Sequence, residues 1–288
     1  MNNIVKIQER IERVRDKAQS DKMRLPFDDW AEELRAAPNE ILRSGIFGVV
    51  RRGRRSYVKE MEMPAPEGFR IAYTGERLDQ SDLDIWLQLL HMARTKTVDD
   101  EIRFPIRWFL KQLQRNVGKS DYEWLDGRMT GLVASATRIE DKSGRVIITG
   151  GLIRAFGYDP ETSEAVVYLN EHLRKLFDNY TLIRWEDRLA LGSDQLAKWL
   201  HAYYSTHAEA YALKVETIMK ACGSQATVLR YFRSGLKGAL DTLKGRGFIS
   251  DWKIDASDLV HVQRKPTPTQ ARHLSLARAR DNSNAPTG

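Results

Sequence analysis

The sequence has little cysteine and no long apolar run. Cys222 is the single cysteine among 288 residues, so the chain cannot form an internal disulfide, which fits a reducing compartment. No apolar stretch approaches the ~20 residues that a membrane-spanning helix needs. Residues 1–6 lack the apolar core of a secretory signal. We therefore expect a cytoplasmic protein without a membrane partner.

Motifs of nucleotide and metal chemistry are also missing. No G-x-x-x-x-G-K-[ST] segment is present, and the six histidines form no H-E-x-x-H or related cluster. His201 lies near Tyr203 and Tyr204 in the sequence. A tyrosine-based nicking enzyme would need paired metal-ligand histidines, which His201 and His207 do not supply. We expect no catalytic residue, no metal site, no cofactor and no enzymatic activity.

Positive charge is in excess. Lys and Arg number 46 against 39 Asp and Glu, which gives a net charge of +7, and the isoelectric point is near 9.4. This balance favours a polyanionic partner but says nothing about the fold. A chain of 288 residues can bury a good core and is long enough for two domains.

Residues 211–263 show the element order of a winged helix. The sequence predicts a strand at 211–215, a short helix at 216–221 and a turn at 222–224. A longer helix follows from about 225 to 244 and ends at Gly245-Arg246-Gly247. Two extended pieces, 248–252 and 259–263, form the predicted wing.

The long helix has two different faces. An apolar stripe follows the helical period, and a stripe of cations lies about 110° away from it. The apolar stripe holds Val228, Phe232, Leu236, Ala239, Leu240 and Leu243, and the basic stripe holds Arg230, Arg233, Lys237 and Lys244. A solvated face of an ordinary amphipathic helix would also explain the basic stripe. The hairpin directly after the helix favours DNA, with the helix in the major groove.

The start of a recognition helix points at base edges, and its later residues meet phosphates. We therefore predict that Gln225, Thr227 and Arg230 contact bases, since Arg can hold guanine and Gln adenine through two hydrogen bonds. The predicted phosphate contacts are Arg233 and Lys237, with Lys253 or Arg264 on the wing side.

Residues 70–150 repeat the element order of residues 193–263: helix, strand, helix, helix, hairpin. Capping boxes at residues 81–84 and 120–123 start the first and third helices, and residues 141–145 form a hairpin turn. We call 70–150 the first module and 193–263 the second. Asp121 and Glu123 open the third helix, so we expect the first module to contribute less to DNA binding, through Arg128, Lys142 and Arg145.

The predicted fold class is α+β, with two tandem winged-helix domains joined by extra strands and flexible N- and C-terminal segments. Residues 1–50 hold a helix and an irregular segment, and residues 51–180 form the first winged-helix domain with its extra strands. Residues 181–264 form the second, and residues 265–288 a disordered basic tail. Within this scheme, residues 179–187 are a connection.

Four segments resemble the TrfA-type replication initiators of broad-host-range plasmids. They are Ile-Ala-Tyr-Thr-Gly-Glu-Arg-Leu at 71–78, Leu-Lys-Val-Glu-Thr at 213–217, Ala-Cys-Gly-Ser at 221–224 and Asp-Leu-Val-His at 258–261. Their order and spacing agree, and the resemblance covers about residues 20–264. It implies two winged-helix domains that bind direct repeats (iterons) in double-stranded plasmid origin DNA. It also implies opening of an A·T-rich segment, recruitment of the host helicase, initiator and sliding clamp, and an inactive homodimer with an active monomer.

The chain departs from this family at its clamp-binding segment. Family members carry a segment of the type Gln-Leu-Ser-Leu-Phe, and the matching residues 22–28 lack the glutamine. Leu25 and Phe27 remain the expected clamp anchors, and packing of both against the first module is the alternative.

A winged-helix transcriptional repressor is the alternative to a replication initiator, since both share the same DNA-binding physics. Tandem direct repeats beside an A·T-rich run would favour the initiator, and a lone inverted repeat the repressor.

Overall fold

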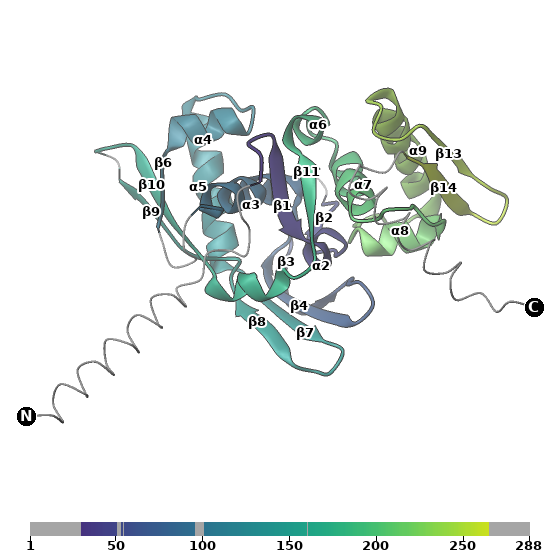
Figure 1. Cartoon of the computed structure of the whole chain (residues 1–288), viewed down its shortest axis with the longest axis horizontal. Coiled ribbons are helices and arrows are strands. Elements are labelled where there is room, and N and C mark those ends of the chain that lie inside the picture. The colour runs from purple at the N-terminus through teal and green to yellow at the C-terminus, as the bar shows by residue number, and fades with distance from the viewer. Residues whose placement is uncertain (1–29, 51–52, 54, 96–100, 160, 265–288) are drawn as a thin grey trace, which may run out of the picture.

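The computed structural model describes residues 30–50, 53, 55–95, 101–159 and 161–264. Figure 1 shows two helix-and-strand modules side by side, with the second module and its long hairpin at the right of the view. The predicted N-terminal helix, the clamp anchors Leu25 and Phe27, and the basic tail lie outside the described residues.

The second module is a winged helix, as the sequence predicts. The three strands form one antiparallel sheet in the order β12-β14-β13, with Leu213 opposite Val260 and Trp252 opposite Val262. Its elements are α7 (Gln195–Ser205), β12 (Leu213–Lys214), α8 (Val215–Ala221), α9 (Leu229–Gly245), β13 (Asp251–Ile254) and β14 (Leu259–Gln263).

Helix α9 begins four residues later than predicted. Val228 is its N-cap, in an extended conformation and without a side-chain cap, so Gln225 and Thr227 belong to the link between α8 and α9. Two β-branched residues, Thr227 and Val228, stand where the helix was expected to start, and such side chains lower helix propensity. The predicted end is confirmed. Gly247 has φ +74, and the N–H groups of Gly247 and Phe248 close a Schellman motif on α9.

The first module has the same order of strands, but with a different hairpin as its wing. Strand β6 pairs with β10, which pairs with β9, so the order β6-β10-β9 matches β12-β14-β13. Its elements are α3 (Gln80–Ala93), β6 (Ile102–Pro105), α4 (Ile106–Gln112), α5 (Lys119–Ala134), β9 (Ile153–Asp159) and β10 (Glu164–Leu169), so the first module extends beyond residue 150 to residue 169. The prediction that the hairpin around residues 141–145 is the wing of the first module is therefore wrong. That hairpin exists, but the wing is formed by β9 and β10.

That hairpin extends a separate sheet. Its strands β7 (Ala136–Asp141) and β8 (Val146–Gly150) continue a sheet started by β3 (Tyr57–Met63) and β4 (Phe69–Glu76), in the order β3-β4-β7-β8. Lys142 and Arg145 lie in the turn between β7 and β8, which projects from the lower edge of the first module (Figure 1).

Three predicted helix starts are also corrected. The capping box of α3 is formed by Asp79 and Asp82 rather than by residues 81–84. Helix α5 starts after Gly118, which offers no side-chain cap, rather than at Ser120. From the sequence, Ser193 is the expected cap of the first helix of the second module, α7, but the Asp194 side chain caps it by accepting the Ala197 N–H at 2.9 Å. Asp79 and Gly118 lie two positions before the predicted caps of α3 and α5, whereas Asp194 lies one position after the predicted cap of α7.

Extra strands join the two modules, as predicted, but they come from segments in which the sequence predicts no strand. Strand β1 (Leu34–Pro38) pairs with β11 (Tyr180–Arg184), Ala36 lying opposite Leu182. The remaining elements are α2 (Asn39–Leu42), β2 (Phe47–Gly48), β5 (Leu78–Asp79), the 3-10 helix η1 (Glu171–Leu176) and α6 (Trp185–Leu189). The expected connection at 179–187 is therefore β11 and the start of α6. Strand β1 was missed because its partner is far away in the sequence.

Two hydrophobic clusters form the interior. The first gathers residues of the first module together with Trp30, Phe47, Ile183 and Trp185. The second is built around Trp199 and the buried side of α9. The division of the chain at residues 50 and 180 stays a prediction from the sequence. Within the described ranges, no helix combines the length and the apolar character that crossing a membrane requires.

Candidate nucleic-acid interface

Helix α9 separates a buried side from an exposed basic edge. Phe232, Leu236, Ala239, Leu240 and Leu243 are buried, which confirms most of the predicted apolar stripe. Arg230, Lys237 and Lys244 are exposed on the other side. Val228 was expected in the apolar stripe and is 43% exposed instead, because it precedes the first turn of the helix.

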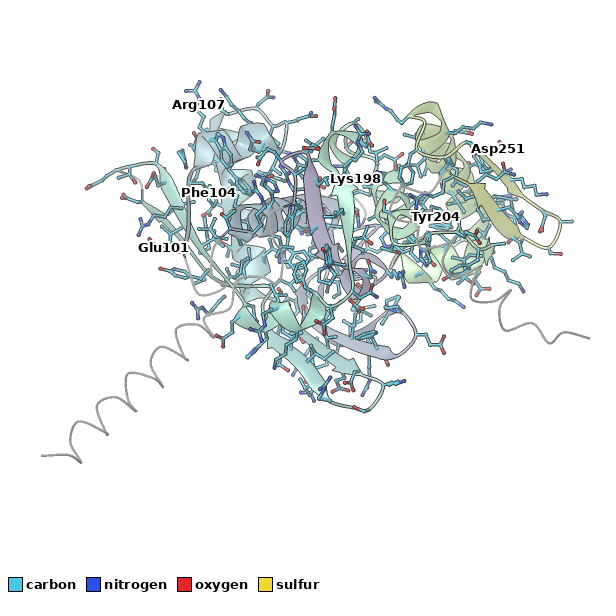
Figure 2. The ribbon with its side chains drawn as sticks, viewed as in Figure 1. Glu101, Phe104, Arg107, Lys198, Tyr204 and Asp251 are labelled. Atoms are coloured by element: carbon cyan, nitrogen blue, oxygen red, sulfur yellow. The ribbon has the colours of Figure 1, made fainter. Side chains whose placement is uncertain are left out.

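The basic edge divides into cations that hold the wing and cations that are open. Arg233 forms an ion pair with Asp258, which lies in the turn between β13 and β14. Lys244 pairs with Asp251 at 2.7 Å, on the outer strand of the wing (Figure 2). Within the described part of the chain, Lys237 has no hydrogen-bond or ion-pair partner. Lys237 is therefore the cation of this edge that is open to a phosphate.

Arg230 stands at the start of α9 beside an exposed tyrosine. Its guanidinium carbon is 5.1 Å from the Tyr231 ring centroid, and its Nη2 donates to the Tyr231 hydroxyl at 3.3 Å. Tyr231 is 65% exposed. Val228 and Tyr231 thus give this end of the helix an apolar surface that a thymine methyl group would fit. The exposure of Tyr231 could have been predicted from the sequence, because this residue falls outside the apolar stripe of the helix.

The two other predicted base-reading residues lie ahead of the helix. The Gln225 side-chain amide is 3.4 Å from the Ser56 hydroxyl of the first module, and Thr227 is exposed. On the wing, Lys253 is exposed on β13. Arg264 is different, because its guanidinium donates to the carbonyls of Tyr204 and His207 and so fastens the end of β14 to α7.

The candidate residues of the first module lie apart from this edge. Figure 1 places the β7–β8 turn, which carries Lys142 and Arg145, at the bottom of the view, apart from the wing at the right. Lys142 is exposed, and Arg145 Nε is 3.0 Å from Asp141 Oδ2. The structure therefore does not bring Lys142 and Arg145 together with α9.

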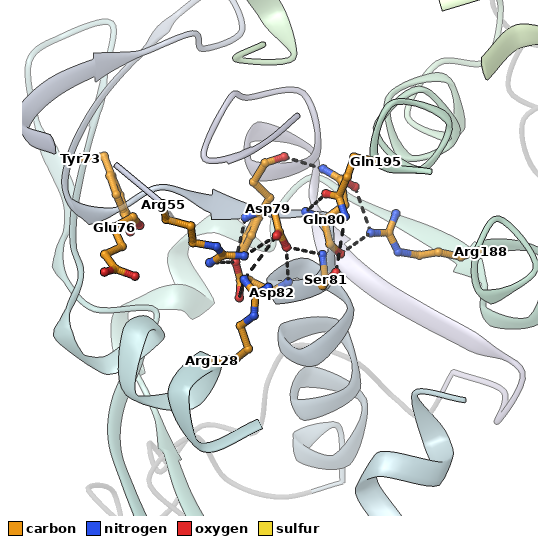
Figure 3. A network of polar contacts seen from close by, with 11 residues as sticks. Arg55, Tyr73, Glu76, Asp79, Gln80, Ser81, Asp82, Arg128, Arg188 and Gln195 are labelled. Atoms are coloured by element: carbon orange, nitrogen blue, oxygen red, sulfur yellow. Dashed lines mark hydrogen bonds and ion pairs between the residues drawn. The ribbon is translucent and has the colours of Figure 1, made fainter. Parts of the chain in front are cut away.

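Arg128 lies in an ionic cluster at the start of α3 (Figure 3). Its Nη1 is 3.3 Å from Asp79 Oδ2 and 3.4 Å from Asp82 Oδ1, and Arg55 binds the same two carboxylates. Burial, followed by the charge of Asp79, raises the pKa of Asp82 well above its usual range, against the opposing effect of Arg55. These contacts tie Arg128 to the capping box and leave it less available to a ligand.

A second polar group joins α3 to the second module. The Gln80 backbone N–H donates to Gln195 Oε1 at 2.8 Å, and Arg188 donates to the Gln80 carbonyl at 3.2 Å (Figure 3). Asp84 pairs with Arg188 at 2.6 Å and with Lys198 at 2.5 Å, and all three side chains are buried. The described residues hold no group of three or more His, Cys, Asp or Glu placed to bind a metal ion.

Known proteins resemble the chain in both sequence and fold. The plasmid replication initiator protein TrfA of Escherichia coli is 28% identical over 260 residues, which cover 86% of this chain and 67% of the relative. A structure of domains 2 and 3 of RctB superposes with a TM-score of 0.54 at 9% identity, over 80% of this chain and 98% of that one. The structure of the Pi initiator protein in complex with iteron DNA has a TM-score of 0.47 at 12% identity, over 64% and 94%. The RctB likeness supports the fold alone. The sequence profile of the TrfA protein family matches residues 8–264, and the chain belongs to that family.

Proposed function

We propose that this protein initiates plasmid replication by binding direct repeats in the origin. The observation that carries the proposal is the winged helix of the second module, whose long helix presents an open basic edge, in a chain of the TrfA family. A helix of this shape fits the major groove, and the wing reaches the adjacent backbone. The protein acts through binding rather than through a chemical step.

The test is maintenance of a plasmid from which the initiator gene has been removed. Cells that supply this protein in trans should maintain a plasmid that carries the cognate origin, and footprinting should protect its direct repeats. A plasmid that is lost although the protein is present would contradict the proposal. Protection of a lone inverted repeat at a promoter would instead favour a transcriptional repressor.

Within the repeat, we assign base contacts to Arg230 at the start of α9, with Gln225 and Thr227 in the link before it. Lys237 and Lys253 meet phosphates. Arg233 acts through the wing, because its ion pair with Asp258 fixes the turn between β13 and β14. The contacts of Lys142, Arg145 and Arg128 with DNA are proposed as secondary, and Arg128 can make them only by leaving Asp79 and Asp82.

The host sliding clamp, helicase and initiator are the proposed protein partners, and the homodimer is proposed as the inactive form. Leu25 and Phe27 are the proposed anchors in the groove of the clamp, since two apolar side chains on a short peptide suit such a groove. Pull-down of the purified clamp should fall to background for Leu25→Ala plus Phe27→Ala, while Leu274→Ala plus Leu276→Ala, in the tail, should leave it unchanged. Equal retention of the clamp by both double variants would contradict the assignment.

A further inference from the structure

Three glycines surround one buried arginine. Gly45 precedes β2 and Gly48 lies in it, and Gly223 lies in the turn between α8 and α9. We count residues 43–49 with the first module, because Phe47 packs in its hydrophobic cluster and β2 pairs with β5. Arg77, between β4 and β5, is 5% exposed, and its Nη2 donates to the Gly223 carbonyl at 2.8 Å. The first module therefore reaches the turn of the helix-turn-helix itself.

The approach of the two modules at this junction leaves no room for a side chain. A Cβ on Gly48 would lie 2.9 Å from Arg77 Nη2 and 3.2 Å from the Gly223 carbonyl oxygen. Gly223 also has φ +57, which favours glycine. Beside it, the backbone N–H of Val49 donates to the Cys222 carbonyl at 2.9 Å. The turn is held to the first module by backbone contacts and by one guanidinium.

Arg77 is poorly suited to a purely stabilising role. Among the described residues no carboxylate lies within ion-pair distance of it, and its Nε is buried without a hydrogen-bond partner. Burial is the main cause that lowers the pKa of Arg77. Burying a charge without an ionic partner costs free energy rather than contributing to stability. A function in placing the turn explains its position better.

The body of the second module has its own attachment to the first. Trp199 Nε1 donates to the Ser44 carbonyl at 3.2 Å, and Arg43 donates to Thr206 Oγ1 at 2.8 Å. Both contacts involve α7 or the residue after it, and α3 meets α7 as well. A change at Arg77 would therefore leave the modules docked and loosen the α8–α9 turn, which would keep its backbone hydrogen bond between Val49 and Cys222.

We propose that Arg77 is a positioning residue, which fixes the angle of α9 to the first module so that one repeat meets both modules at a set spacing. The proposal rests on the proposed function, because it requires a repeat that both modules contact. Arg77 and Gly223 belong to two of the four segments that resemble the TrfA-type family, at 71–78 and 221–224, and the fold brings these two segments into contact.

The test uses the full-length protein, the Arg77→Met variant and Arg70→Met as the matched control. Arg70 lies on β4 with a side chain 65% exposed, and its ionic contacts are to Glu62 and Glu140 of the same sheet. Hydroxyl-radical footprinting of the wild type first locates the two protected tracts of the repeat. Duplexes with one base pair inserted between these tracts are then titrated alongside the native repeat, and thermal unfolding checks that each variant is folded.

The wild type and Arg70→Met should lose about tenfold or more in affinity on the inserted duplex, because one base pair rotates and shifts one tract against the other. Arg77→Met should bind the native repeat more weakly and lose less than about threefold on insertion. Gly48→Ala, which presses a methyl group on the same guanidinium, should show the same tolerance and serves if Arg77→Met does not fold.

Equal sensitivity of Arg77→Met and the wild type to the insertion would overturn the positioning role and leave the proposed function intact. A single protected tract would also overturn the positioning role, because only one module would then contact the repeat and the angle between α9 and the first module would not affect binding. A wild-type protein that does not bind the repeat at all would contradict the proposed function and the positioning role together.

Discussion

Arg230 and Lys237 lie on the same exposed edge of α9, two turns apart, yet they differ in their surroundings. Arg230 stands at the N-terminal end of the helix, with its guanidinium carbon 5.1 Å from the Tyr231 ring centroid. Lys237 lies in the middle of the helix with no partner in the described part of the chain. A planar guanidinium suits two parallel hydrogen bonds to guanine, whereas an ammonium acts as a point charge on a phosphate.

Substitution of these two residues should therefore give different phenotypes. Arg230→Ala should cost about 1–3 kcal/mol on the cognate repeat and relax discrimination at one base pair. Lys237→Ala should weaken binding to all sequences and lower the salt slope by about one unit. Titrations on cognate and scrambled repeats at two salt concentrations measure both. Equal losses on both sequences for both variants would mean that α9 only holds the backbone.

His201 is a buried histidine, and the folded protein disfavours its protonated, charged form. It is 2% exposed, it packs on the Phe248 ring with centroids 4.3 Å apart, and its Nδ1 has no partner among the described residues. Burial, helped by the charges of Arg188, Arg264 and Lys198, lowers the pKa of His201 from 6.5 to about 3. The folded protein therefore keeps this ring neutral.

The pKa shift of His201 predicts a loss of stability in acid. The unfolded chain binds a proton below pH 6.5 and the folded one does not, so stability is full above that pH and falls below it. Between pH 7 and pH 5 His201 alone should cost about 2 kcal/mol. His201→Phe should reduce the pH dependence of the unfolding free energy over this range, whereas His172→Phe, at an exposed position, should not. A slope should remain in His201→Phe, because burial also lowers the pKa values of His91 and His207 to about 4. A slope that His201→Phe leaves unchanged would place the titrating group elsewhere.

At the scale of the element, α9 carries two interior glycines where alanine would fit. A Cβ on Gly235 or Gly238 would meet no atom within 4 Å. Glycine in an exposed helix interior costs about 1 kcal/mol relative to alanine. Both positions lie beside Tyr231 and Ser234 on the exposed side of the helix, which is the side that a DNA groove would approach.

Gly238→Ala should therefore separate stability from binding. The folded protein should gain about 1 kcal/mol from the better helix former. Affinity for the repeat should fall, because the added methyl group stands between the helix and the DNA. Thermal unfolding and titration on the same preparation give both values, and Thr130→Ala, on the exposed side of α5, controls for a general effect of alanine. Higher stability with unchanged affinity would show that DNA does not approach this side.

The boundaries of α9 show how much of an element the sequence can predict. Its end was predictable because Gly247 adopts a positive φ that completes a local motif. Its start was not, because Val228 provides no side-chain cap, and the Ser224 hydroxyl instead accepts the Ala226 N–H at 3.1 Å. Hairpins show the same limit. The turn between β7 and β8 can be recognised from neighbouring residues. The hairpin of β9 and β10 is the wing because β10 pairs with β6, and these two strands are separated in the sequence by α4 and α5.

For the whole molecule, the element order and the family resemblance together predicted two winged-helix modules, which the fold confirms. The sequence did not predict how the modules meet, because the contacts join residues more than a hundred positions apart. One such contact joins three charged residues, Asp84 on α3, Arg188 on α6 and Lys198 on α7. From the sequence alone, charged residues of this kind are expected at the surface. In the fold their side chains are at most 9% exposed.

The Asp84 carboxylate is the one acidic partner that Arg188 and Lys198 have within ion-pair distance among the described residues. Asp84→Ala would leave two buried cations facing each other, and breaking a buried pair typically costs about 3–5 kcal/mol. Because this group links α3 to α6 and α7, the loss should fall on the contact between the modules. We expect calorimetry to show a single unfolding transition for the wild type and two separated transitions for Asp84→Ala. Asp187→Ala, which removes an exposed partner 3.5 Å from Arg184, should cost less than about 1 kcal/mol and keep one transition. A loss for Asp84→Ala no larger than for Asp187→Ala would mean that apolar packing, and not this ionic group, couples the two modules.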